Sequence, residues 1–389
     1  MTLRADVVVV GGGVIGSSIA HALAAGGTGD VLLVEQGTPG AQGATARSGG
    51  LLRMHHTFEG DVRLAVASHR TYAAWEDEVG GECGFRRTGF AMVVGPEHAE
   101  RLRANADAVA AHSYETHVVG PEELEELQPS WSAEGVGAAA WEPESGYADP
   151  VRTTRALVER GRERGLRVLE GTRAEGLVRS NGRVGGVRTS RGEVAAGTVV
   201  LAGGAWSAPL LAELGVDVPV ETVHIGTCLV EGARLPEEPA SCTAIDDTTG
   251  TYFRPDGGRC LLAGVPTGRS RLDPDVEPPP LAPGELEESR SRLGRRIPAL
   301  EDGRVVGTTS GFDGYTPDKH PLIGPVEGVE GAYLAVGFSG GGFKVAPAVG
   351  EAVAAEIVGG ERRAELEPFR PERFARGRPV EPSHPYTHM

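Results

Sequence analysis

The residues best placed to bind a ligand are three glycines and an acidic residue near the N-terminus. Gly11, Gly13 and Gly16 form G-x-G-x-x-G directly after a β-branched run at residues 6–10. The first glycine permits a tight turn, the second lets a pyrophosphate approach, and the third allows close packing of helix and strand. Glu35 follows about 20 residues later, where a carboxylate can accept hydrogen bonds from ribose hydroxyls. The spacing predicts a dinucleotide site and leaves FAD and NAD both open.

A second glycine cluster lies in GFSGGGFKVAPAVGE, close to the other end of the chain. It contains Gly337 and the run 340–342, and Lys344 follows at once. Without side chains, these positions would let the backbone approach a ligand closely. The helix that we expect from about Pro347, with proline in its first turn, would point its positive end at that ligand.

Alternating strand and helix patterns must position both clusters. We expect a strand at 6–10, a helix at 14–25 and a strand at 31–34, as in a parallel sheet buried on both faces. The pair Asn181-Gly182 is a hairpin signal. Proline excludes regular structure from 273–285. Further helices are expected at 63–78, 96–111, 151–165, 286–295 and 347–358, strands at 198–202, 304–309 and 332–336, and a loop at 316–326.

Length, charge and cysteine content restrict the class of protein. A chain of 389 residues is expected to form two domains. A formal net charge of −16 argues against binding to nucleic acid or to an anionic membrane surface. The four cysteines are scattered and form no C-x-x-C pair, so neither a zinc site nor a disulfide framework is expected. These features fit a reducing cytoplasm.

Four motifs in one order resemble a known family. They are VVVVGGGVIG…LLVEQ, GATARSGGLLR, VVLAGGAWS and TPDKHPLIGP…GFSGGGFKVAPAVGE, and they span nearly the whole chain. The pattern resembles the FAD-dependent amine and amino-acid oxidoreductases, which include D-amino-acid oxidase, glycine oxidase and monomeric sarcosine oxidase. The last motif is most similar to the sarcosine oxidase branch.

The resemblance implies an α/β fold of two discontinuous domains. Residues 1–85, 147–220 and 304–375 would form a Rossmann-like FAD-binding domain. Residues 86–146 and 221–303 would form an α+β substrate domain whose antiparallel sheet covers the flavin. Residues 376–389 would be a poorly ordered tail.

The resemblance also assigns roles to individual residues. Arg53 and Lys344 match two cations that bind the substrate carboxylate. Tyr252 lies on the predicted strand above the flavin, where it is either a polar site residue or an aromatic residue packed in the sheet. His55 and His56 are weaker candidates, for which a structural or surface role is favoured. The cofactor-binding residues would be Gly11, Gly13, Val14, Ile15, Gly16, Glu35, Gln36, Thr45, Ser48, Gly49, Ala174, Gly203, Trp206, Gly337, Ser339, Gly340, Gly341, Gly342, Phe343 and Lys344.

The chain departs from the family pattern at three positions. Gly311 replaces the cysteine that attaches the flavin in the sarcosine oxidase branch, so we expect non-covalent FAD. Leu262 replaces a lysine that promotes the reaction with oxygen. Asp313 stands where glycine oxidase has a carboxylate-binding arginine. It could hold a substrate ammonium or cap the turn before Gly314.

The implied reaction is oxidation of the C–N bond of a small amino or imino acid to an imine, by hydride transfer to flavin N5. Three alternatives stay open: a dehydrogenase with an acceptor other than oxygen, a desaturase of a cyclic imino acid, and an FAD-binding electron-relay subunit of a complex. The expected partner is a small carboxylated amine. The sequence does not decide the oligomeric state.

Overall fold

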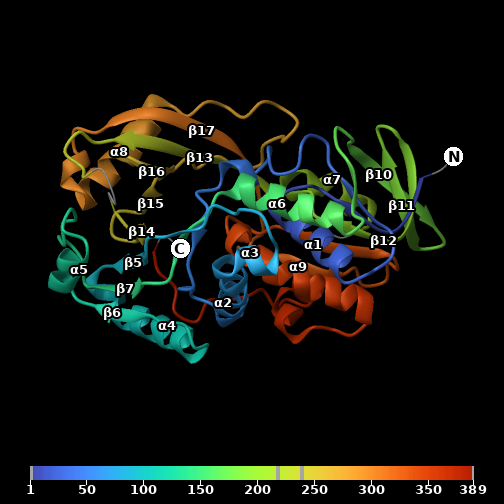
Figure 1. The fold of residues 1–389 in the computed structure, drawn as a ribbon, viewed down its shortest axis with the longest axis horizontal. Helices are drawn as coiled ribbons and strands as arrows, with labels where there is room; N and C mark the ends of the chain where they lie inside the picture. Colours follow the sequence, from blue (N-terminus) through green and yellow to red (C-terminus); the bar gives the residue numbers. More distant parts are fainter. Residues whose placement is uncertain (1–2, 216–219, 237–240, 388–389) are drawn as a thin grey trace.

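Two large sheets lie in opposite halves of the molecule (Figure 1). The computed structural model describes residues 3–215, 220–236 and 241–387. The helices are α1 (Val14–Ala25), α2 (Glu59–Ala73), α3 (Trp75–Glu78), α4 (Ala99–Ala111), α5 (Pro121–Leu127), α6 (Pro150–Glu163), α7 (Ala208–Glu213), α8 (Pro283–Arg296) and α9 (Gly342–Gly359).

The first sheet is mainly parallel and is covered on both faces. Its central strands pair in the order β12-β1-β2-β9, all in parallel, and β19 joins the other side of β12. Alternate residues of β1 face different cores: Val7 and Val9 pack with α1 and α9, while Val8 and Val10 pack with α7. The strands are β1 (Leu3–Val10), β2 (Val31–Val34), β9 (Arg167–Leu169), β10 (Ala174–Ser180), β11 (Arg183–Thr189), β12 (Gly192–Leu201), β18 (Leu322–Pro325) and β19 (Ala332–Val336).

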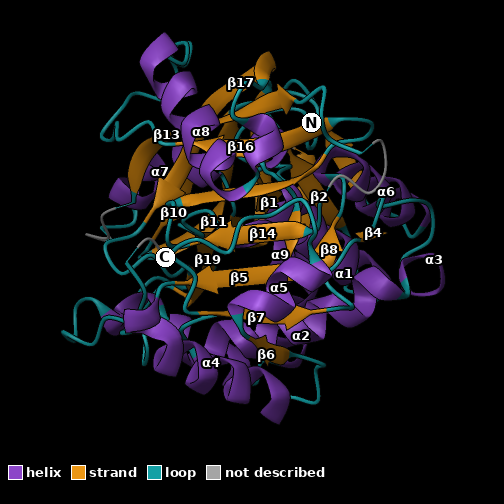
Figure 2. Cartoon of the chain, turned by 90° about the vertical axis from the view of Figure 1, so that its left-hand side faces the viewer, coloured by secondary structure: helices purple, strands orange, loops and turns teal. Residues whose placement is uncertain are grey.

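The second sheet has the order β17-β13-β16-β15-β14-β5-β7-β6 and is antiparallel except between β5 and β14. Figure 2 faces this sheet, with α8 beside β16 and α4 at the end formed by β7 and β6. The strands are β5 (Phe90–Val94), β6 (His117–Val119), β7 (Ala138–Glu142), β13 (Glu221–Glu231), β14 (Thr243–Asp246), β15 (Thr251–Pro255), β16 (Cys260–Val265) and β17 (Arg304–Tyr315).

The α/β fold class is therefore confirmed, while the domain boundaries stay a proposal. One strand crosses the expected division: β17, which the sequence analysis assigns to the FAD-binding domain, pairs along its length with β13 of the second sheet. A third, small sheet consists of β3 (Leu51–Leu52), β8 (Gly146–Tyr147) and β4 (Arg86–Arg87), with β8 in the middle.

The glycine-rich segment near residue 340 differs from expectation. Helix α9 begins at Gly342, so Pro347 lies inside the helix and not in its first turn. Proline has no N–H to donate to the carbonyl four residues earlier. That carbonyl, on Phe343, accepts a hydrogen bond from the Tyr72 hydroxyl at 2.8 Å instead. Tyr72 of α2 thus supplies the hydrogen bond that the proline cannot donate. Because α9 begins at Gly342, Lys344 lies in the first turn of the helix. The expected loop at 316–326 also contains strand β18.

The described residues 375–387 are anchored to the protein, whereas a poorly ordered tail was expected at 376–389. Val380 and Tyr386 are buried, and the backbone N–H of Ser383 donates to the Thr57 carbonyl at 2.9 Å. Figure 1 places the C-terminus between the two halves, close to β14. The burial of an apolar and an aromatic side chain holds this segment in place. The basic, proline-containing composition of the segment gave no sign of these contacts.

A buried ion pair fixes the turn between β14 and β15. Arg296 Nε lies 2.8 Å from Asp246 Oδ2, and the two side chains are 1% and 0% exposed. Arg296 also donates to the Ser132 carbonyl and the Thr248 hydroxyl. Asp246 in turn accepts from the N–H of Thr248. This network ties α8 to the turn that closes one side of the cavity described below.

Arg296→Met should lower the free energy of unfolding by about 3–5 kcal/mol, because it leaves Asp246 buried without its counter-charge. Chemical denaturation would measure the change. Arg304→Met is the matched control: its partner Glu231 lies 2.7 Å away, but the side chains are 77% and 43% exposed. We expect an effect of less than about 1 kcal/mol there. Equal losses of unfolding free energy in the two variants would contradict the conclusion that the buried pair of Arg296 and Asp246 fixes this turn.

Candidate active site

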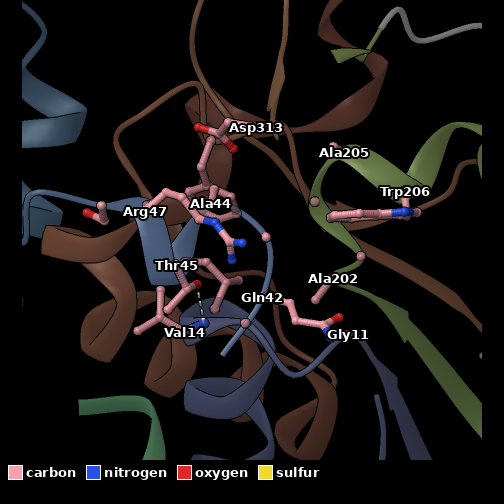
Figure 3. A pocket seen from close by; sticks show the side chains of 18 of the residues that line it. Gly11, Val14, Gln42, Ala44, Thr45, Arg47, Ala202, Ala205, Trp206 and Asp313 are labelled. Carbon is pink, nitrogen blue, oxygen red and sulfur yellow. Dashed lines mark hydrogen bonds between the residues drawn. The ribbon is translucent and has the colours of Figure 1, made fainter. Parts of the chain in front are cut away.

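A cavity of about 630 Å³ follows the carboxyl ends of the first sheet (Figure 3). Its size is typical of a cofactor pocket. Gly11 has φ of +105°, and a Cβ there would lie 2.5 Å from the Ala202 carbonyl oxygen. A Cβ on Gly16 would lie 1.9 Å from the Gly11 carbonyl oxygen, so Gly16 packs the helix on the strand and does not line the cavity. Gly11 and Gly16 thus permit the tight turn and the close packing of helix on strand that the G-x-G-x-x-G pattern predicts.

Glu35 stands at the end of β2 and lines this cavity. Its carboxylate accepts hydrogen bonds from the N–H groups of Gly12 at 2.6 Å and Gly37 at 2.7 Å. These bonds fix the side chain beside the glycine turn. Thr45 Oγ1 accepts from the Val14 N–H at 3.0 Å, the contact drawn as a dashed line in Figure 3. The loop after Glu35 is thereby held against the N-terminus of α1, where the helix dipole favours phosphate.

The lining of the cavity includes Arg173, which was not predicted from the sequence, and Asp275 binds this residue from outside the lining. Arg173 and Asp275 form a two-bond pair, with Nη–Oδ distances of 2.8 and 2.6 Å. Trp206, which lines the cavity as expected, donates to Asp275 at 3.0 Å. Through Asp275, the proline-rich segment 273–285 therefore contacts two residues that line this cavity. Its sequence carries no signal for this contact because the partners come from three distant segments.

Asp313 positions the second glycine cluster. Its Oδ1 accepts from the Gly314 N–H and its Oδ2 from the Gly340 N–H, both at 2.8 Å. Burial raises the pKa of this carboxyl to about 6. Both oxygens therefore hold backbone, as the turn-capping alternative requires, and the side chain still lines the cavity. A direct contact with the substrate stays a prediction.

Arg53 and Lys344 lie where the cofactor cavity meets a second cavity of about 390 Å³, because both line each cavity. Arg53 is 8% exposed; its Nη1 donates to the His55 carbonyl, and its Nε has no partner among the described residues. Burial lowers the pKa of Arg53 to about 10. Burial, and then the positive charge of Arg53, lowers the pKa of Lys344 to about 7. Two buried cations thus share one wall.

Acidic groups surround this pair, and the sequence analysis identified only Asp313. Glu142 accepts from the Met54 N–H at 2.9 Å, and burial raises its pKa to about 7. Asp61 lines the second cavity, and its Oδ2 lies 3.7 Å from His320 Nε2. Burial raises the pKa of Asp61, although His320, Lys344 and Arg53 oppose the change. Neither acid carries a motif in the sequence, since each is brought to Arg53 by tertiary packing.

The remaining candidate site residues differ in position: some line a cavity, and one is buried in the core. Tyr252 lines both cavities, and burial raises its pKa to about 12. His56 lines the second cavity, whereas His55 is fully buried; burial and then Arg53 keep both imidazoles uncharged by lowering their pKa. The structure places in the first cavity the expected Gly11, Gly13, Val14, Ile15, Glu35, Gln36, Thr45, Ser48, Gly49, Ala174, Gly203, Trp206, Gly337, Gly340, Gly342 and Phe343, and in the second Ser339 and Gly341.

Comparison with known proteins gives one consistent result. The family model for the DAO group, described as FAD dependent oxidoreductase, matches residues 6–356. Mitochondrial dimethylglycine dehydrogenase of Rattus norvegicus is 26% identical over 96% of this chain and 45% of its own length. The chain thus spans about half the length of such curated relatives. No helix in the described part of the chain is long and apolar enough to cross a bilayer.

Two solved structures share the fold of this chain over nearly their whole length. L-proline dehydrogenase from P. horikoshii has a TM-score of 0.87 at 29% identity, covering 97% of this chain and 99% of that one. Glycine oxidase from Geobacillus kaustophilus has a TM-score of 0.81 at 25% identity, covering 95% and 98%. The glycine turn, Glu35 and the cavity between the sheets fit the cofactor that the family model implies. The chain belongs to the DAO family of FAD-dependent oxidoreductases.

Proposed function

We propose that this protein oxidises the C–N bond of a small amino or imino acid to an imine. One observation carries the proposal: two buried cations, Arg53 and Lys344, stand at the junction of the cofactor cavity and the second cavity. A cofactor and a carboxylated substrate that occupy these two spaces would meet beside the two cations.

The electrostatics of the junction support a carboxylate ligand. A buried charge is costly unless it is paired, and the Arg53 Nε has no partner among the described residues. An arginine fork and a lysine point charge together match the geometry and charge of one carboxylate. Such a ligand would also reverse the lowering of the Lys344 pKa, since the lowering comes from burial and from Arg53.

The chain's own residues would orient the substrate and exclude water. Binding of the carboxylate by Arg53 and Lys344 fixes the α-carbon relative to the cofactor cavity, and such orientation lowers the barrier. Ile245, Tyr252 and Val265 of the second sheet line both cavities and would cover the reacting bond. Bound FAD would supply the hydride acceptor.

Related proteins support this substrate class. Their names refer to dimethylglycine, L-proline and glycine, and each of these small amino acids carries a carboxylate. For the electron acceptor, Leu262 supports a dehydrogenase, because an apolar side chain packs near Gly49 where the sarcosine oxidase branch has lysine. For the attachment of FAD, Gly311 supports non-covalent binding, because it offers no side chain and is covered by Arg47.

An anaerobic screen tests the reaction. The purified yellow protein should lose its oxidised-flavin absorbance when mixed with amino or imino acids that carry a carboxylate next to the nitrogen-bearing carbon. The same amines without the carboxylate should react far more slowly. Release of hydrogen peroxide in air, compared with reduction of an artificial dye, then separates oxidase from dehydrogenase. If no carboxylated amine bleaches the flavin, the proposed substrate class is wrong.

Arg53→Ala should raise KM and lower kcat/KM by about 30- to 3000-fold, the range expected when one member of a buried charge pair is truncated. FAD content should be unchanged. Arg63→Ala, on the exposed surface of α2 with its side chain 49% exposed, is the matched control and should behave as the wild type. Unchanged KM and turnover in Arg53→Ala would refute carboxylate binding by this residue.

Carboxylate binding should weaken as the pH rises through about 7, because Lys344 is protonated below its pKa of about 7 and neutral above it. Acetate, which cannot be oxidised at a C–N bond, can be titrated against the flavin spectrum from pH 6 to 9. Glu142, with a pKa of about 7, adds negative charge in the same interval. Lys344→Met isolates the contribution of the lysine: it should bind weakly and with a flatter profile. An identical pH profile in this variant would exclude Lys344 as the titrating group.

A further inference from the structure

The segment 380–387, called here the C-terminal strap, contacts one residue that lines the second cavity and two that adjoin its lining. The Val380 N–H donates to Asp318 at 2.9 Å, next to the cavity-lining residues 319–321. The Ser383 N–H donates to the carbonyl of Thr57, which lines the cavity, at 2.9 Å. The Thr387 N–H donates to Asp247 at 3.2 Å, in the turn after β14. The strap therefore joins segments from both halves of the molecule.

Tyr386 is the side chain through which the strap reaches the site. It is 6% exposed and packs with Phe90 and Leu102 of the second-sheet core. Its hydroxyl lies 2.7 Å from Asn105 Nδ2 and 2.7 Å from His55 Nε2. Its ring stacks on the His55 imidazole with centroids 5.9 Å apart. The imidazole of this fully buried histidine thus has the Tyr386 hydroxyl as its hydrogen-bond partner at Nε2, and its Nδ1 has none among the described residues.

The hydrogen bonds define the direction of this chain of contacts. Asn105 Nδ2 also donates to the His384 carbonyl at 3.0 Å, and a carbonyl can only accept. The Tyr386 oxygen therefore accepts from Asn105, which leaves the Tyr386 O–H able to donate to His55 Nε2. Burial and the adjacent Arg53 lower the pKa of His55 to about 3, so the imidazole is neutral. A neutral ring that accepts at Nε2 carries its proton on Nδ1.

His55 connects this network to Arg53. Its carbonyl accepts from Arg53 Nη1, which holds the guanidinium. Residues 53–58 form no helix or strand, so no ladder of backbone bonds fixes that carbonyl. Its position depends on what holds His55 and its neighbours: Glu142 on the backbone N–H groups of residues 54 and 55, Tyr386 on the imidazole, and Ser383 on the Thr57 carbonyl.

We propose that Tyr386 is a positioning residue for the substrate carboxylate: its hydroxyl holds His55, and the His55 carbonyl holds the guanidinium of Arg53. This inference rests on the proposed function, in which Arg53 binds that carboxylate. It adds a determinant of substrate affinity that lies outside both cavities and comes from the last described segment of the chain.

Tyr386→Phe tests the proposal in the full-length, FAD-loaded protein. Loss of one hydrogen bond should raise KM for the amine and Kd for acetate by about three- to tenfold. We expect kcat and FAD content to change little. Tyr333→Phe is the matched control, since it also removes a buried hydroxyl, which donates to Glu356 at 3.0 Å in the cofactor half. Asn105→Ala, which leaves the O–H of Tyr386 in place, should give a smaller rise of the same sign and replaces Tyr386→Phe if that variant does not fold.

A second readout does not depend on catalysis. In protein labelled with ¹⁵N-histidine, NMR should show His55 as the Nδ1–H tautomer in the wild type and in Tyr333→Phe, with a changed or averaged signal in Tyr386→Phe. Wild-type acetate affinity and KM in Tyr386→Phe would overturn the positioning role alone. Failure of the unmodified protein to bind acetate or oxidise any carboxylated amine would instead refute the proposed function, and the positioning role with it.

Discussion

The burial of two positive charges side by side is the constraint on which the rest of the site depends. Arg53 and Lys344 repel each other, and each loses hydration in the wall between two cavities. The fold offsets this cost with nearby acids, of which Glu142, Asp61 and Asp313 are the ones that act on these cations. Among the described residues, none of the three lies within ion-pair distance of either cation, which is consistent with the carboxylate ligand proposed above.

Each half of the molecule contributes one surface to that junction. The first sheet supplies the glycine turn and α9, whose first turn carries Lys344. The second sheet supplies Ile245, Tyr252 and Val265 opposite it. Residues 337–342 pass between these surfaces. Two hydrogen bonds fix this loop: the Gly340 N–H donates to the Asp313 carboxylate, and the Ser339 N–H donates to the Gly314 carbonyl. Because both of its oxygens accept backbone hydrogen bonds, Asp313 is buried without an ion pair.

Local order around the site comes from compensations that link distant segments. Pro347 leaves a carbonyl of α9 without its usual donor, and Tyr72 of α2 satisfies it. The turn after β14 is held by Arg296 from α8 and by the C-terminal strap. Both devices hold segments that line one of the two cavities, through groups that line neither of them. Such groups are selected by packing geometry, and their residue types alone carry no indication of the role.

The sequence by itself determined the features that contiguous residues control. The G-x-G-x-x-G turn, its strand and helix, and the acid after the next strand were all predicted, because each depends on backbone conformation within one βαβ unit. The Asn181-Gly182 hairpin was predicted for the same reason, and both residues have positive φ, 51° and 78°. The start of α9 was misplaced because a proline inside a helix is tolerated only with an external donor, which local sequence cannot show.

Only the tertiary structure decided the charge state and the supports of the site. The lowered pKa of Lys344 results from burial and from Arg53, and both follow from the packing of segments far apart in the chain. Asp61, His320 and Tyr386 reach the same region from three different segments, without a motif in any of them. Residue types and spacing thus specified what can bind, whereas long-range packing specified how tightly each group is held and which proton it carries.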